Sequence, residues 1–220
     1  MKKLVVIAAL SLTGLAAFGQ GSLNFGNSFS GSFIMPIFGP DPANPTLALS
    51  GAPSTSRVSG VIPSTGTTVY GGPLLQGTGY TLQLWAGSTT GNLAPTTYIT
   101  SFRTSTGDKL PAGLVSGAVG VVIPGVDAGQ QAFYQLRVWD NKGGQATTWA
   151  AGLAGGTYGS SAIVLSGALG GVDSTGGIHA TSPNSTDWVS FNLISNVPEP
   201  TSLALAGLGA AAMMIFRRRK

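Results

Sequence analysis

The stretch Tyr80-Thr81-Leu82-Gln83-Leu84-Trp85 decides the fold class, because its pattern recurs as Tyr134-Gln135-Leu136-Arg137-Val138-Trp139. Both copies read Tyr, polar, aliphatic, polar, aliphatic, Trp, and turn-forming residues follow each of them. A strict alternation of polar and apolar residues over six positions is typical of a half-buried β-strand. The repeat predicts two equivalent strands at the centre of a sheet.

The alternation also assigns each side chain to a face, because successive side chains of a strand point to opposite sides. The apolar positions of the two copies are expected to face the core. The opposite, outer face is expected to carry Thr81, Gln83 and Trp85 from the first copy and Gln135, Arg137 and Trp139 from the second.

The rest of the body consists of short strand-like segments separated by turn residues. No long apolar stripe with a 3.6-residue period, free of Gly and Pro, occurs there. We therefore predict a single antiparallel β-sandwich, Ig-like or jelly-roll, and the pattern does not choose between these topologies. The further strand-like segments are 23–25 and 33–35 (a first hairpin or an entry strand), 98–102, 114–123 before a turn at Pro124-Gly125, 147–150, 162–165 and 189–193.

Residues 39–73 are rich in Pro, Ser, Thr and Gly and carry only two strand-like pieces, at 58–62 and 67–70. Prolines interrupt strand pairing, so we interpret this stretch as a loop at the edge of the body. A disordered linker is the alternative, because the stretch has little apolar surface to offset the entropy of ordering.

The amino terminus has the three parts of a secretory signal peptide. Basic residues Lys2 and Lys3 precede an apolar run at 4–18, and Ala17-Phe18-Gly19 matches a small-x-small cleavage pattern. We predict a signal peptide at 1–19, removed by signal peptidase after passage through the general export machinery, and an exported domain at 20–196. An uncleaved anchor is the alternative.

The carboxyl terminus has a different order of parts. Val197-Pro198-Glu199-Pro200 forms a stiff spacer, an uncharged helix is expected at about 202–216, and Arg217, Arg218, Arg219 and Lys220 follow. The helix is short for a bilayer, but basic side chains can reach the interface and mark the cytoplasmic side. Residues 217–220 are thus expected to act as a membrane stop, with the body outside.

The segment 197–220 resembles the PEP-CTERM sorting signal of exported proteins of Gram-negative bacteria, through Pro198-Glu199-Pro200, the apolar helix and the basic end. This resemblance implies processing near the motif by an exosortase, a membrane enzyme, followed by delivery to the cell surface or extracellular matrix. It also implies that the protein accompanies the systems that make exopolysaccharide and biofilm. Before processing, a single C-terminal helix would hold the precursor in the inner membrane. A plain anchor with an incidental Pro-Glu-Pro linker is the alternative.

Charge and cysteine content exclude several classes of protein. The formal net charge of +4 comes from the two ends, because residues 21–196 hold five Lys or Arg against six Asp. No basic face remains for a nucleic acid. The chain has no cysteine, which excludes a disulfide framework and thiolate metal sites in an exported protein.

Residues suited to catalysis are sparse. The lone histidine, His179, sits in a glycine-rich segment without a G-x-S-x-G nucleophile, and Glu199 is the lone glutamate. Asp140-Asn141 and Asp173 offer oxygen ligands for calcium, but no EF-hand pattern surrounds them, which favours turn caps. We expect no catalytic residues, no metal site and no cofactor.

The outer-face residues Trp85, Trp139, Gln83 and Arg137 form a candidate carbohydrate-binding surface, because flat aromatic rings beside hydrogen-bonding groups suit a sugar. The alternative is that each tryptophan packs under a loop. We predict an exported structural protein of the surface or matrix. An envelope-anchored module that binds exopolysaccharide is the second hypothesis, and a hydrolase using aspartates is the third.

Overall fold

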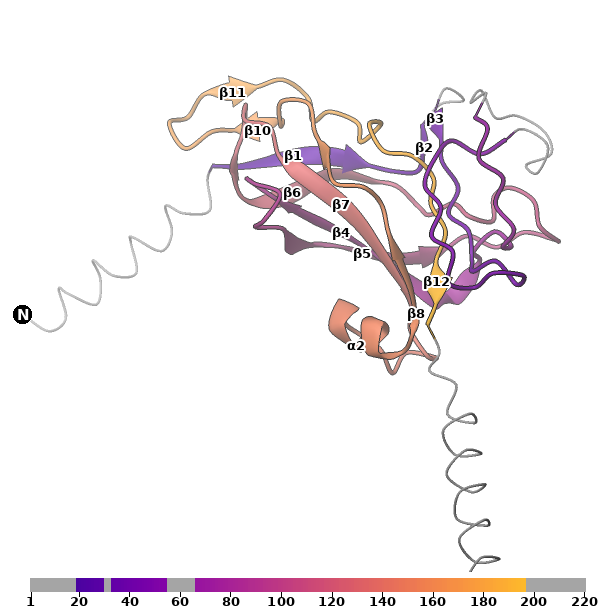
Figure 1. Ribbon diagram of the computed structural model, residues 1–220. Coiled ribbons are helices and arrows are strands. Elements are labelled where there is room, and N and C mark those ends of the chain that lie inside the picture. Colours follow the sequence, from indigo (N-terminus) through magenta and orange to yellow (C-terminus); the bar gives the residue numbers. More distant parts are fainter. Residues whose placement is uncertain (1–18, 30–32, 55–65, 197–220) are drawn as a thin grey trace, which may run out of the picture.

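The computed structural model describes residues 19–29, 33–54 and 66–196 of the 220-residue chain (Figure 1). The body is mainly β, as predicted, and also contains the short helix α2 (Trp149–Ala154). The signal peptide apart from Gly19, the predicted strand at 58–62 and the sorting segment at 197–220 lie outside the described residues. The strands are β1 (Gln20–Phe25), β2 (Ser28–Phe29), β3 (Phe33–Ile34), β4 (Gly77–Gly87), β5 (Ala94–Phe102), β6 (Ala118–Asp127), β7 (Phe133–Asp140), β8 (Thr157–Ser160), β9 (Val164–Leu165), β10 (Gly171–Val172), β11 (Ile178–His179) and β12 (Ile194–Ser195).

The two copies of the repeated pattern form neighbouring strands of the largest sheet, whose order is β12-β8-β7-β4-β5, with β9 also beside β7. β4 and β7 run antiparallel in unbroken register from Tyr80 opposite Asp140 to Gly87 opposite Phe133. Leu84 lies opposite Leu136, so apolar side chains of both strands share one face. The prediction of two equivalent central strands is confirmed.

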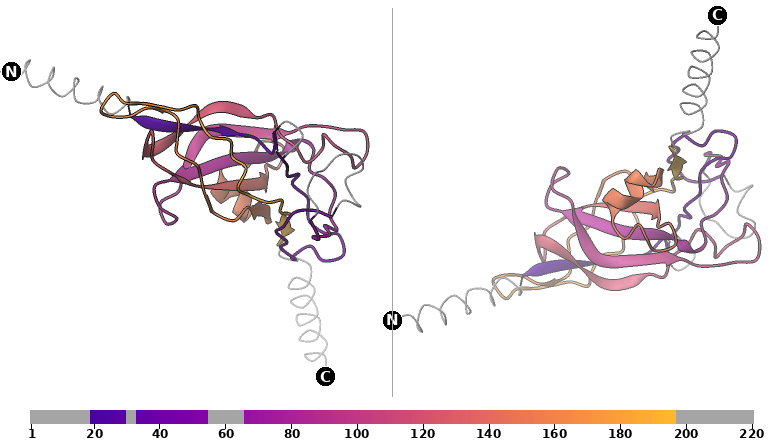
Figure 2. Two further views of the ribbon diagram at one scale, coloured as in Figure 1. Left: turned by 90° about the horizontal axis from the view of Figure 1, so that it is seen from above. Right: turned by 90° about the horizontal axis from the view of Figure 1, so that it is seen from below.

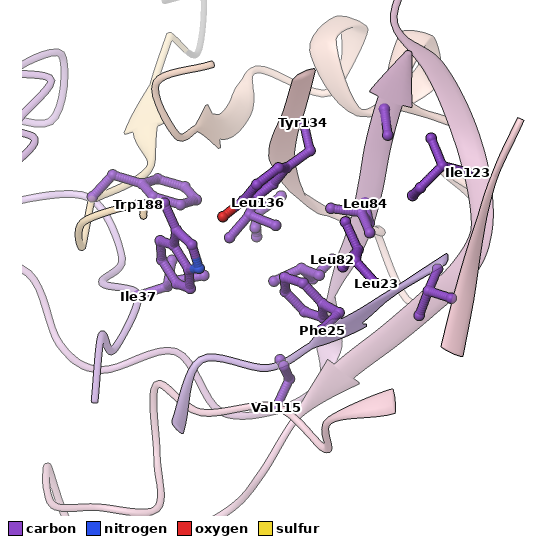
Figure 3. Close-up of a cluster of buried hydrophobic side chains, with 14 of the residues drawn as sticks. Leu23, Phe25, Ile37, Leu82, Leu84, Val115, Ile123, Tyr134, Leu136 and Trp188 are labelled. Atoms are coloured by element: carbon purple, nitrogen blue, oxygen red, sulfur yellow. The ribbon is translucent and has the colours of Figure 1, made fainter. Parts of the chain in front are cut away.

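The core lies between the inner face of this sheet and the ribbon of β1 and β6. Leu82, Leu84 and Leu136 of the sheet are fully buried, and they pack in one cluster with Leu23 of β1 and Ile123 of β6. Figure 3 shows these side chains pointing toward one another across the gap. Segment 23–25 is therefore an entry strand that pairs with β6, not one half of a hairpin with 33–35.

Trp188 belongs to the same core cluster (Figure 3). Its indole is 2% exposed and meets the rings of Phe33 and Phe191 edge-on, at centroid distances of 5.8 and 6.4 Å. The indole nitrogen donates to the carbonyl of Ser185 at 3.1 Å. Trp188 thus fixes a segment with little regular pairing to the body, together with backbone bonds such as that from the N–H of Ser185 to the carbonyl of Asn24.

The described parts of the 39–73 region pack against the body in a second, smaller cluster. Phe38 and Tyr70 stack with centroids 4.1 Å apart, and the Tyr70 hydroxyl lies 2.7 Å from the carbonyl oxygens of Gly51 and Ser190. Buried Asn192 adds two more bonds, accepting from the Leu49 N–H and donating to the Leu47 carbonyl. The described parts of this region therefore pack on the body, and the loop interpretation of the whole stretch stays a prediction.

Two predicted strand boundaries are wrong. Pro124 and Gly125 do not end a strand but lie inside β6. Between the pairs Gln20–Asp127 and Ser22–Val122, β6 contains more residues than its partner β1. Gly125 has a φ of +69°, which glycine adopts without strain, so the extra residues form a bulge. Segment 189–193 forms only isolated bridges, and the strand β12 comes directly after it.

The predicted strand at 147–150 is also wrong, because the chain turns there and starts α2. The Thr148 hydroxyl caps the helix by accepting from the N–H of Ala151 at 3.3 Å. The preceding turn contains Gly143 and Gly144 at φ +67° and +92°, and it returns the chain over the sheet. Figures 1 and 2 show α2 on the side of the sheet that faces away from β1 and β6.

Within the described ranges, no helix combines the length and apolar character that a membrane span requires. The predicted helix at 202–216 lies outside those ranges.

Candidate binding surface on the outer face of the sheet

The register of β4 and β7 brings the predicted outer-face residues together. Gln83 lies directly opposite Arg137, and Trp85 lies opposite Gln135. Since side chains two positions apart in a strand share a face, Trp139 lies on this face as well. The prediction that Trp85, Trp139, Gln83 and Arg137 share one face is confirmed.

The prediction that Trp139 projects outward with Trp85 is wrong, because α2 covers it completely. Trp139 is 0% exposed, and its indole nitrogen donates to the carbonyl of Ala146 at 2.7 Å. Gly152 of α2 lies directly on the ring, where a Cβ atom would come within 2.3 Å of the Trp139 Cγ. Because Gly152 has no side chain, the backbone of α2 can pack directly against the indole of Trp139.

Trp149, which the sequence analysis did not single out, takes the place of Trp139 at the surface. It is the first residue of α2, is half-buried, and meets the ring of Trp139 edge-on at 6.1 Å and that of Tyr158 at 5.8 Å. A capping Thr148 before a Trp-Ala-Ala run is a helix-start signal that could have found it.

Trp85 and Trp149 line the same hollow, which has a volume of about 290 Å³. Its wall also includes Gln83 and Pro95 of β4 and β5, and its other side is formed by Thr147, Thr148 and Ala150. Trp149 and Tyr158 line a second hollow of about 240 Å³. Shallow apolar walls with hydroxyl and amide groups beside them are features of ligand sites.

Two glutamines hold the side chains of Trp85 and Arg137 in place. On β4, Gln83 accepts a hydrogen bond from the indole nitrogen of Trp85 at 3.2 Å. On β7, Gln135 accepts from Nε of Arg137 at 2.9 Å, while its amide nitrogen donates to the carbonyl of Ser161 at 3.0 Å. In both strands the glutamine precedes its partner by two positions, so the alternation of the sequence builds the contact.

Arg137 lies against both tryptophans of the hollow. Its guanidinium carbon is 3.9 Å from the centre of the Trp85 ring and 5.4 Å from that of Trp149, within the range of cation–π attraction. Burial lowers the pKa of Arg137. The guanidinium stays charged at neutral pH, because its ordinary pKa is far above 7.

His179, expected in a solvated loop, lies instead in β11 with Nε2 2.8 Å from Oδ2 of Asp173. The bonds from His179, from Thr175 and from the N–H of Gly177 hold the pKa of Asp173 well below its usual value. In the described part of the chain no serine hydroxyl is hydrogen-bonded to His179. This pair closes the β10–β11 turn.

The aspartates named as calcium candidates cap their own turns. Asp140 accepts from the N–H of Lys142 at 2.8 Å and pairs with its ammonium at 3.0 Å. Asp173 accepts from the N–H groups of Thr175 and Gly177 at 2.9 and 2.7 Å. These bonds are those of turn caps. Over residues 19–29, 33–54 and 66–196, no three His, Asp or Glu side chains gather in one place.

The last described residues lead directly to the carboxyl-terminal segment. β12 pairs with β8 through Ile194 and Ser195, and the N–H of Asn196 donates to the carbonyl of Gly156 at 2.6 Å. The residues that follow contain Pro198-Glu199-Pro200, the apolar run and the basic end.

Residues 196–220 match the family model of the PEP-CTERM protein-sorting motif. The predicted resemblance is thereby confirmed for this segment. The PEP-CTERM motif indicates an exported protein that an exosortase, a membrane enzyme, processes. Neither the curated proteins nor the solved structures include a match to the chain.

Proposed function

We propose that this chain is a structural protein of the cell surface or extracellular matrix, sorted there through its PEP-CTERM segment and without catalytic activity of its own. In this proposal signal peptidase and the export machinery act on residues 1–19, and an exosortase acts near Pro198-Glu199-Pro200. Residues 20–196 are the delivered domain, an antiparallel β-sandwich. The observation that carries the proposal is the match at residues 196–220.

The arrangement of the chain supports this division. Among the described residues the last strand ends at Ser195, and the family match starts at the next residue. Processing after that point would remove no strand and no core residue of the body. A body with few charges is also weakly repelled by its own copies, which favours association in a matrix.

A transfer experiment tests the sorting function. Residues 196–220 fused to an unrelated exported passenger are expected to bring the passenger to the cell surface of a host that has an exosortase. The measurement is surface labelling, compared with the passenger alone and with a host that lacks the enzyme. A fused passenger that reaches the surface equally well without the enzyme would contradict the proposal.

The hollow between Trp85 and Trp149 supports a second function, the binding of carbohydrate such as an exopolysaccharide. Sugar rings have apolar faces that pack on flat aromatic rings, while their hydroxyl groups bond to polar neighbours. The hollow supplies two indoles, the amide of Gln83 and the hydroxyl groups of Thr147 and Thr148. Trp139, buried under α2, has only a supporting role in this function.

Trp149→Ala is expected to weaken binding to a polysaccharide about tenfold or more, because it removes one wall of the hollow. Trp85→Ala is expected to have a similar effect. The matched control is Ile178→Ala on β11, where the side chain is 88% exposed and outside the hollow. Affinity electrophoresis in polysaccharide gels measures the change. Equal retardation of the wild type and both tryptophan variants would exclude this surface.

A further inference from the structure

Arg137 is a cation without an acidic partner in the described part of the chain. It sits in the middle of β7 and is half-buried. Among residues 19–29, 33–54 and 66–196, the ion pairs join Asp140 to Lys142 and Asp173 to His179, and neither involves Arg137. Its side-chain hydrogen bond there runs through Nε to Gln135. The two terminal nitrogens of the guanidinium therefore have donors to spare.

The position of this cation is fixed before any ligand arrives. Gln135 holds Nε at 2.9 Å and is itself bonded to Ser161, and the Trp85 ring supports the flat face of the guanidinium at 3.9 Å. A planar guanidinium that is already oriented loses little entropy on binding and matches a carboxylate with two parallel hydrogen bonds. Lysine, with a flexible stem and a point charge, would lack this match.

The neighbours of Arg137 restrict what the anion can belong to. The guanidinium does not itself line the 290 Å³ hollow, but it lies against the ring of Trp85 and within cation–π range of Trp149, which both do. A ligand that uses the hollow and Arg137 together needs an apolar ring face for the indoles and an anionic group at the edge of that ring. A sugar with a carboxylate on its ring meets both conditions, whereas a neutral sugar offers the guanidinium only uncharged hydroxyl acceptors, which form weaker hydrogen bonds than a carboxylate does.

We propose that the outer-face hollow binds an acidic polysaccharide through its uronic acid residues, with Arg137 donating to the ring carboxylate. The proposal rests on the carbohydrate-binding function given above and names its class of ligand. The body as a whole carries almost no net charge, so selectivity for the acidic sugar comes from one residue and not from a basic face.

The test compares two polymers that differ only in the carboxylate: polygalacturonate, and the same polymer with its carboxyl groups reduced to alcohols. Binding to protein recovered from the cell surface is measured by calorimetry. The wild type is expected to bind the acid about tenfold more tightly than the reduced polymer, as loss of a charged hydrogen-bonded pair implies. Dextran sulfate is expected to bind more weakly than polygalacturonate.

Arg137→Gln is expected to lose the preference for the acid and to keep the affinity for the reduced polymer. Arg137→Lys keeps the charge without the planar fork and should keep part of the preference. Arg103→Gln is the matched control, since Arg103 is exposed and outside the hollow, and it should behave as the wild type. Circular dichroism and thermal unfolding check the fold of each variant, and if Arg137→Gln does not fold, Arg137→Lys carries the comparison.

The possible failures are distinct. Equal affinity of the wild type for the two polymers overturns the acidic ligand and leaves carbohydrate binding in place. No binding of either polymer overturns both. A preference for the acid that survives in Arg137→Gln, one that stays undiminished in Arg137→Lys, or dextran sulfate binding as tightly as polygalacturonate overturns the role of Arg137 in recognising a carboxylate.

Discussion

Removal of residues 197–220 is expected to abolish delivery of the protein to the cell surface, while the body still folds. The described body ends at Asn196 with β12 already paired, so the deletion removes no described hydrogen bond or core side chain. The family match covers the deleted residues. Cell fractionation with surface labelling measures the result, and the truncated protein should appear soluble outside the inner membrane.

A substitution separates recognition of the motif from membrane insertion. Pro198→Ala with Pro200→Ala leaves the apolar run and Arg217–Lys220 unchanged. This variant is expected to stay in the inner membrane as an unprocessed precursor. Thr186→Ala on the exposed surface of the body serves as the control and should be delivered normally. Normal delivery of either the truncated protein or the double variant would contradict a sorting role for the segment.

Leu136→Ala is expected to lower the free energy of unfolding by about 2–5 kcal/mol, the range for deleting a buried leucine side chain. Leu136 is 0% exposed and lies opposite Leu84, so a cavity would open in the core on the inner face of the sheet, where Tyr134 of the same strand also points (Figure 3). Such a loss is a large part of the stability of a domain of this size. Denaturant unfolding followed by tryptophan fluorescence measures it.

Tyr134→Phe is the matched control on the same strand and the same face. The Tyr134 hydroxyl is buried, and among the described residues it makes no hydrogen bond of good geometry. Burial raises the pKa of Tyr134, and a backbone group of Asp187 opposes part of that rise. Removing this hydroxyl while keeping the ring should leave stability unchanged or raise it. A Leu136→Ala protein as stable as Tyr134→Phe would show that β4 and β7 are not the centre of the core.

The central strands were predictable because their signal is local. Leu82, Leu84 and Leu136 alternate with polar residues in six-residue runs, and a sheet buried on one face imposes that alternation directly. The shared outer face of Gln83 and Arg137 followed from the same period. The pairing of β4 with β7 rather than with another strand needed the structure.

The burial of part of the outer face by α2 was not predictable in the same way. α2 has only six residues, too few for a 3.6-residue period to show, and its Trp149 was placed in a strand. Burial of Trp139 depends on Gly152 meeting it from a separate element, and no pattern within β7 carries that information. Of the four residues proposed from the sequence, Trp85 and Gln83 line the hollow, Arg137 lies against its tryptophans, and Trp139 is buried, so that Trp149 lines the hollow instead.

The central claim is that residues 196–220 are a sorting signal that an exosortase recognises and processes. The intact mass of the protein recovered from the cell surface tests this claim most directly. The account predicts a mass that lacks both the signal peptide and the segment after the Pro198-Glu199-Pro200 motif. A surface protein whose mass still includes every residue through Lys220 would contradict it.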